Sequence, residues 1–99
     1  MSYVTTQPET LSATAANLAG VGAAMSAQNS AAAAPTTGVI PPAADQVSAL
    51  AAAQFAIHAE MYQAISAQAE AVHQQLVSTL VTNALSYAAT EAANATATS

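Results

Sequence analysis

Residues 38–45, Gly-Val-Ile-Pro-Pro-Ala-Ala-Asp, divide the chain into two long alanine-rich stretches. Proline has no backbone N–H and disrupts a helix interior, so Pro41 and Pro42 must lie outside a helix or in its first turn. Asp45, which follows them closely, is suited to the cap or the first turn of the next helix. The sequence therefore predicts a turn at about residues 36–43, with a helix on each side.

The stretch before the turn is predicted to form a helix over about residues 8–35. Pro8 is tolerated in a first helical turn, and Glu9 places a negative charge at the positive end of the helix dipole. Thr6 and Glu9 also have the spacing of a capping box, in which each side chain binds a free backbone N–H of the first turn. Pro8 and Glu9 are therefore expected to mark the start of this helix.

Larger apolar residues in the first helix recur every seven positions, which is the pattern of a narrow coiled-coil stripe. Gly20 and Gly22 weaken the helix by about 1 kcal/mol each relative to alanine. They can instead permit a close approach of a neighbouring element. The stripe residues expected at an interface are Leu11, Leu18 and Met25.

The second helix is predicted over about residues 43–86, a rod of about 60 Å at 1.5 Å per residue. Its large apolar residues follow three–four spacing, and a second stripe begins late in the helix, at Val77. A helix that is apolar on two sides contacts two neighbours, whereas the first helix can cover only one. A partner chain or self-association would cover the other apolar side of the second helix. The residues expected at the hairpin or partner interface are Val47, Leu50, Phe55, Ile57, Met61, Tyr62, Ile65, Val72, Leu76 and Leu80.

The C-terminal segment contains an aromatic residue and an acid one helical turn apart. Tyr87-x-x-x-Glu91 places both side chains on one helix face, where a receptor could bind them together. The alternative is a last helical turn in which Tyr87 packs against the core. Residues 88–99 have few large side chains and are expected to form a flexible tail, so the helical unit is predicted to span residues 1–87.

The composition predicts a chain that needs a partner to fold. Of its 53 apolar residues, 30 are alanine, which buries little area on folding. The chain has 99 residues and no Lys or Arg, and its formal net charge is -5. Nucleic-acid binding requires cations that displace phosphate counterions, and binding to anionic membranes benefits from them. We therefore expect a protein partner and no nucleic acid.

Residues that could perform chemistry are scarce. Cysteine is absent, so disulfides and thiolate metal sites are impossible. Glu70 and His73 have the Glu-x-x-His spacing of di-iron bundles, but those sites need a second such pair and two further glutamates. His58 is expected to be a neutral histidine buried at the interface and hydrogen-bonded across it. We expect no catalytic residue, no metal ligand and no cofactor, and hence no enzyme.

Two kinds of membrane-directed segment are also missing from the sequence. The first residues contain no basic group and no apolar run of the kind found in a secretory signal. No run of 18 apolar residues without polar breaks is present, so no spanning segment is expected. If the protein is exported, its signal must lie elsewhere in the chain.

The motifs together resemble the PE family of mycobacteria. The resemblance covers the whole chain, and the proline-rich turn is its most specific part. The matching segments are Pro8-Glu9, Ala34-Pro35-Thr36-Thr37, Pro41-Pro42-Ala43-Ala44-Asp45 and Tyr87-x-x-x-Glu91.

This resemblance implies an all-α fold, in which an antiparallel two-helix hairpin completes a four-helix bundle with a PPE-family protein. It implies that the folded pair leaves the cytoplasm through a type VII (ESX) secretion system and reaches the cell surface, the envelope or the medium. Tyr87 and Glu91 would then form the secretion signal. A cytosolic chaperone would hold the PPE chain before export.

A different function remains open at this stage. An amphipathic, alanine-rich chain could also be a structural element associated with the envelope or a membrane, or a self-associating helical bundle. Flotation of the chain with liposomes, with and without its partner, would distinguish these alternatives.

Overall fold

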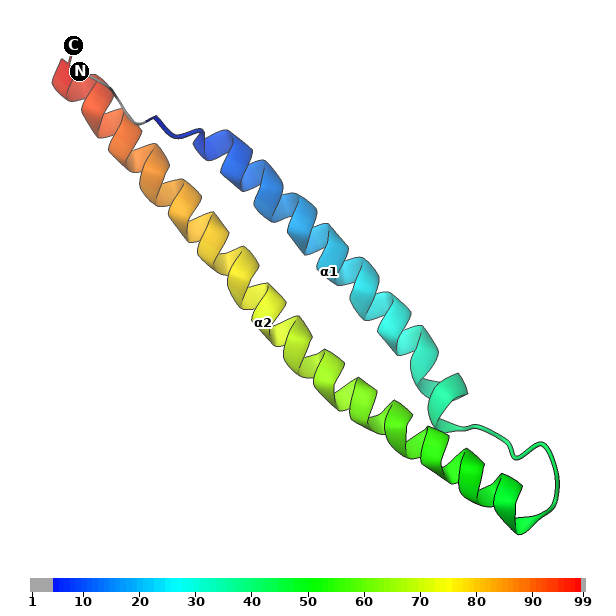
Figure 1. The fold of residues 1–99 in the computed structure, drawn as a ribbon. Coiled ribbons are helices and arrows are strands. Elements are labelled where there is room, and N and C mark those ends of the chain that lie inside the picture. Colours follow the sequence, from blue (N-terminus) through cyan, green and yellow to red (C-terminus); the bar gives the residue numbers. More distant parts are fainter. Residues whose placement is uncertain (1–4, 99) are drawn as a thin grey trace.

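The computed structural model describes residues 5–98, which form two antiparallel helices joined by one turn (Figure 1). Helix α1 spans Pro8–Thr37 and helix α2 spans Gln46–Thr98. The hairpin is a thin rod of 80 × 19 × 18 Å. Within the described residues there is no strand, so the predicted all-α hairpin is confirmed.

The start of α1 agrees with the sequence in its boundary and differs in its cap. Pro8 is the first residue of α1 and Glu9 lies in its first turn. The predicted capping box is wrong, because Gln7 occupies the cap position and no side chain there binds a free backbone N–H. The hydroxyl of Thr6 instead donates to the carboxylate of Glu91, 85 residues away in the sequence.

Helix α1 continues past Pro35, which lies inside it, and ends at Thr37. The hydroxyls of Thr36 and Thr37 donate to backbone carbonyls one turn earlier, at 2.6 and 2.7 Å. These hydrogen bonds supply donors to carbonyls near the end of the helix. The helix is therefore two residues longer than predicted.

Asp45 caps α2 from outside the helix. Its Oδ1 accepts a hydrogen bond from the backbone N–H of Ser48 at 2.8 Å, and its Oδ2 accepts one from the Ser48 hydroxyl at 3.0 Å. These bonds, the backbone one first, lower the pKa of Asp45 from 3.8 because they favour the charged form. The prediction that Asp45 lies at the cap is confirmed, although α2 begins at Gln46, not near residue 43.

The C-terminal boundary of the second helix was predicted too early. Helix α2 remains helical to Thr98, through the segment expected to be a flexible tail from residue 88 onward. No glycine or proline follows Pro42 in the sequence, and alanine is the strongest helix former. The hydroxyls of Thr90 and Thr98 also bind backbone carbonyls one turn earlier.

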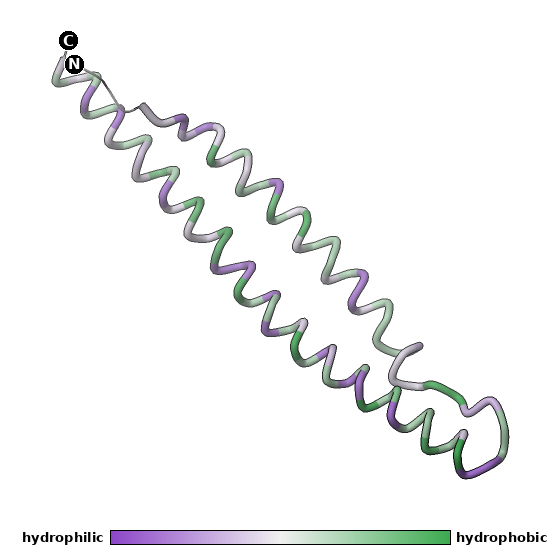
Figure 2. Tube along the Cα trace, in the orientation of Figure 1, coloured by the Kyte–Doolittle hydropathy of each residue, from purple (hydrophilic) through white to green (hydrophobic). Residues whose placement is uncertain are grey.

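The two helices face each other through small residues. In the described chain only Ala15, Ala52 and Ala84 are buried, and no large side chain is fully buried. Figure 2 shows hydrophobic positions along the length of both helices. The hairpin therefore has a core of alanine, and most of its large apolar side chains remain in contact with solvent.

Candidate partner interface

The large apolar residues predicted for the interface mostly lie outside the contact between α1 and α2. Among them, only Leu11, Leu18 and Leu80 are partly buried. Inside the hairpin the others are exposed and do not form a buried seam, although Met25, Tyr62 and Ile65 line the groove between the helices. A role for them against a partner chain stays a prediction. The exposed members are Met25, Val47, Leu50, Phe55, Ile57, Met61, Tyr62, Ile65, Val72 and Leu76.

Five of these exposed residues form a continuous row along α2, which we call the lateral stripe. It consists of Phe55, Tyr62, Ile65, Val72 and Leu76, with spacings of three, four or seven residues that keep the side chains on one helix face. Each is between 49% and 65% exposed. A row of this kind has the pattern of a helix–helix seam, but the hairpin leaves it uncovered.

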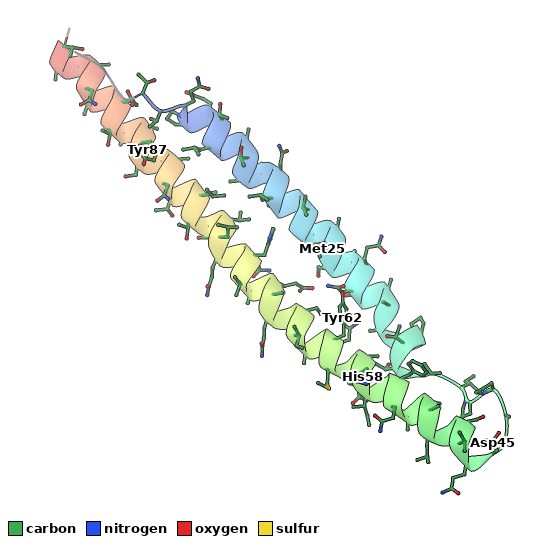
Figure 3. The ribbon with its side chains drawn as sticks, in the orientation of Figure 1. Met25, Asp45, His58, Tyr62 and Tyr87 are labelled. Carbon is green, nitrogen blue, oxygen red and sulfur yellow. The ribbon has the colours of Figure 1, made fainter. Side chains whose placement is uncertain are left out.

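The lateral stripe borders a groove of about 700 Å³ between the two helices. Met25 contributes from α1, and Tyr62 and Ile65 contribute from α2. Figure 3 shows Met25 and Tyr62 on these two facing helices. The apolar lining also includes Ala69 and Val77, and the polar lining includes Asn29, Glu70, His73 and Gln74.

A second, smaller hollow lies near the turn. It is lined by Ala32 and Val39 on one side and by Phe55, His58 and Tyr62 on the other. The lateral stripe thus runs beside the space between the helices from the turn to the middle of the hairpin. A helix laid along this side would contact both α1 and α2.

Polar contacts from Asn29 join the helices at the groove. The Tyr62 hydroxyl donates to Asn29 Oδ1 at 2.7 Å, and Gln63 Nε2 donates to the Asn29 backbone carbonyl at 3.0 Å. Such directional bonds favour one alignment of the two helices where small apolar residues discriminate poorly between alignments.

His73 makes the third cross-helix contact in this region. Its Nε2 lies 2.6 Å from the backbone carbonyl of Leu18. A carbonyl only accepts, so Nε2 must carry the proton. The sequence pointed instead to His58, which is exposed and makes no such bond in the described structure, so that prediction is wrong. The sequence signal for His73 as the histidine that bonds across the helices is a glycine on the facing helix.

That glycine is Gly22, which leaves room for the imidazole. A Cβ atom at position 22 would lie 2.6 Å from Cδ2 and 2.8 Å from Nε2 of His73. Gly20 has no such neighbour within 4 Å of the equivalent position. Close approach, one of the two roles considered for these glycines, therefore applies at Gly22 alone.

Tyr87 lies on α2 near the start of α1, toward the open end of the hairpin (Figure 3), and Glu91 follows it one turn later on the same helix. Tyr87 is 45% exposed, whereas Glu91 is partly buried. The Glu91 carboxylate accepts the 3.1 Å hydrogen bond from Thr6. Both side chains stand on regular helix, one turn apart, and the acid is linked to the segment that precedes α1.

Other kinds of site find no support in the described part of the chain. Residues 5–98 contain no group of three or more histidine and acidic side chains placed to hold a metal ion. Neither described helix has an apolar stretch long enough to cross a membrane. The uncovered apolar surface and its groove are therefore the features on which a function can be argued.

Comparison with known proteins gives a family match over most of the chain. The family model described as the PE family matches residues 4–94. The chain is 62% identical over 99 residues to the PE family protein PE13 of Mycobacterium tuberculosis, and the match covers both chains completely. It is 52% identical over 97 residues to the PE family protein PE8 of the same species, covering 98% of this chain and 35% of that relative.

A match of 55% identity over 95 residues to the PE-PGRS family protein PE_PGRS33 covers 96% of this chain and 20% of that relative. The chain thus spans the full length of one relative and about a third or less of two longer ones. With a family match over nearly all its residues and a full-length relative at 62% identity, the chain belongs to the PE family.

Proposed function

We propose that this chain is a non-enzymatic helical partner that pairs with a PPE-family protein and completes a four-helix bundle. The observation that carries the proposal is that the buried residues are small, whereas the large apolar residues are exposed. Three alanines are buried, while the lateral stripe of five large apolar residues is about half exposed or more. Covering that stripe would supply the apolar burial that the hairpin lacks.

The groove beside the stripe supports a helical partner. The groove lies between α1 and α2, so a helix placed in it would contact both of them, as in the seams of helical bundles. A partner with two helices could cover the lateral stripe and the groove together. We therefore place the heterodimer contact on this side of the hairpin.

Export is the second part of the proposal. Membership of the PE family supports secretion of the pair through a type VII (ESX) system, from the cytoplasm to the cell surface, the envelope or the medium. In this proposal Tyr87 and Glu91 form the secretion signal. Their position at the open end of the hairpin leaves the lateral stripe free for the partner, while a cytosolic chaperone binds the PPE chain.

The pairing is tested by coexpressing the chain with a PPE-family protein and measuring copurification and thermal unfolding of the complex. Ile65→Ala should destabilise the complex by about 2–5 kcal/mol, the usual effect of truncating a well-packed isoleucine. Leu85→Ala is the comparison variant, because Leu85 is similarly exposed, at 66% against 61%, but lies on the late second stripe that begins at Val77 and not on the lateral stripe.

The proposed interface fails if Ile65→Ala leaves the unfolding temperature of the complex unchanged. Equal losses for Ile65→Ala and Leu85→Ala would show that the contact is not confined to the lateral stripe. Absence of any complex between the wild-type chains would contradict the pairing with this partner.

A further inference from the structure

Glu70 is the one acidic side chain that lines the interhelical groove. The lining around it includes the apolar residues Met25, Ala69 and Val77, together with the neutral polar side chains of Ser66 and Gln74. It is partly buried and still reaches water, since the described chain contains no buried polar side-chain atom without a partner. Glu70 takes part in no hydrogen bond or ion pair among residues 5–98. Its charge is therefore balanced by solvent alone.

A helix that fills the groove would remove this water. A carboxylate that loses its hydration without gaining a counter-ion or hydrogen-bond donors is strongly unfavourable. The occupant must consequently supply a compensating group at the level of Glu70. This requirement restricts the chemistry of the chain that can bind there.

The chain supplies no counter-ion itself, because Ser66 and Gln74, one turn from Glu70 in the groove lining, are neutral donors. It contains no Lys or Arg anywhere in its sequence, so neither another segment nor a second copy brings a permanent cation to the groove. Of its two histidines, His58 does not line the groove. His73, one turn from Glu70, already directs Nε2 to the Leu18 carbonyl. The missing charge must come from a different protein.

We propose that the groove binds a helix of a different chain whose apolar face carries one Lys or Arg opposite Glu70. This inference rests on the proposed pairing and specifies the chemistry of the partner. Arg fits the role well, because its planar fork can bind both carboxylate oxygens and it is the more weakly hydrated cation. The ion pair would also set the register of the partner along a groove otherwise lined mainly by apolar and neutral polar groups.

Glu70→Gln tests the inference, because it removes the charge and keeps the shape of the side chain. Glu60→Gln is the matched control, since Glu60 is exposed and does not line the groove. Affinity for the PPE-family partner is measured for both variants, with circular dichroism to verify that helix content is retained. No described side chain depends on Glu70, so neither variant should disturb the hairpin.

The two possible arrangements predict changes of opposite sign. If a partner cation faces Glu70, Glu70→Gln should raise the Kd by about 30-fold or more, as expected for truncating one member of a close charge pair. Glu60→Gln should leave the Kd within about twofold. If no cation faces Glu70, the substitution removes an uncompensated charge and the affinity should stay the same or increase, which would overturn the inference.

Charge reversal provides a second test that does not depend on one variant. Glu70→Arg should abolish binding, and replacing the facing cation of the partner by Glu should restore it. Failure of every such partner replacement to restore binding would overturn the inference while leaving the pairing intact. Failure of the wild-type chain to bind, or a homodimer that occupies the groove, would instead contradict the proposed function itself.

Discussion

Gly22→Ala and Gly20→Ala are expected to differ in their effects on stability, although they make the same chemical change in the same helix. Both replace a glycine inside α1 with a stronger helix former. At Gly20 the added methyl group meets no atom within 4 Å. At Gly22 it would lie 2.6 Å from Cδ2 of His73, which is too close for the imidazole to stay in place.

The magnitude of the difference follows from two opposing effects. Replacing glycine by alanine in a helix interior stabilises it by about 1 kcal/mol, and Gly20→Ala should show this gain in full. Gly22→Ala makes the same gain but displaces His73 from the Leu18 carbonyl, and a hydrogen bond of this kind contributes about 0.5–1.5 kcal/mol. The net effect of Gly22→Ala should therefore be close to zero, about 1 kcal/mol less favourable than that of Gly20→Ala.

The assay is urea unfolding of the complex with the coexpressed PPE-type protein, followed by circular dichroism at 222 nm at a fixed protein concentration. A double-mutant cycle with His73→Ala isolates the interaction. Without the imidazole, Gly22→Ala meets no obstacle from His73 and should stabilise by about the same 1 kcal/mol as Gly20→Ala. The coupling between positions 22 and 73 should thus be about 1 kcal/mol.

Equal stabilisation by Gly20→Ala and Gly22→Ala in the wild-type background would refute this reasoning. It would mean that His73 does not occupy the space beside Gly22 in solution. Zero coupling in the double-mutant cycle would lead to the same conclusion, even if the single variants differed.

Three further outcomes are expected. The isolated chain should show no cooperative thermal transition at low concentration, because its buried core consists of three alanines; a sharp transition by circular dichroism would contradict this. Tyr87→Ala and Glu91→Ala should leave copurification with the partner intact and strongly reduce the secreted fraction in a host with a working type VII system. Lost copurification would indicate a packing role for Tyr87, and normal secretion of both variants would exclude the signal. Asp45→Ala should lower the unfolding temperature at neutral pH. The folded pKa of Asp45 lies below 3.8, so its stabilisation is present above that pH and is lost as the pH falls through the folded pKa. The difference from wild type should therefore shrink in acid, and a constant difference would argue against the cap.

Local features of the fold could be predicted because they depend on residues close together in the sequence. Pro41 and Pro42 exclude a continuous helix, and Asp45 satisfies a backbone N–H three residues ahead of it. The family could be recognised for a related reason, since its motifs lie at characteristic positions in the chain. The end of α2 does not follow from the lack of large side chains after residue 87, because alanine sustains a helix without them.

The second helix carries two series of apolar residues on different faces. The sequence pattern alone does not show which series faces α1. Ala52, Ala56 and Ala59 begin one series at three–four spacing, and Phe55 and Tyr62 belong to another. The large residues are the ones expected to face α1, because burial of large side chains usually dominates packing. In the hairpin the alanine series faces inward, and the large residues remain outside.

The sequence by itself determined that this protein is two alanine-rich helices around a proline turn, with few large apolar residues and no Lys or Arg. Only the tertiary structure decided which faces meet, since that depends on contacts between residues far apart in the chain. The pairing of His73 with the space beside Gly22, the bond from Thr6 to Glu91 and the position of Glu70 in the groove are of this kind. Each depends on the relative placement of distant segments, which local spacing does not specify.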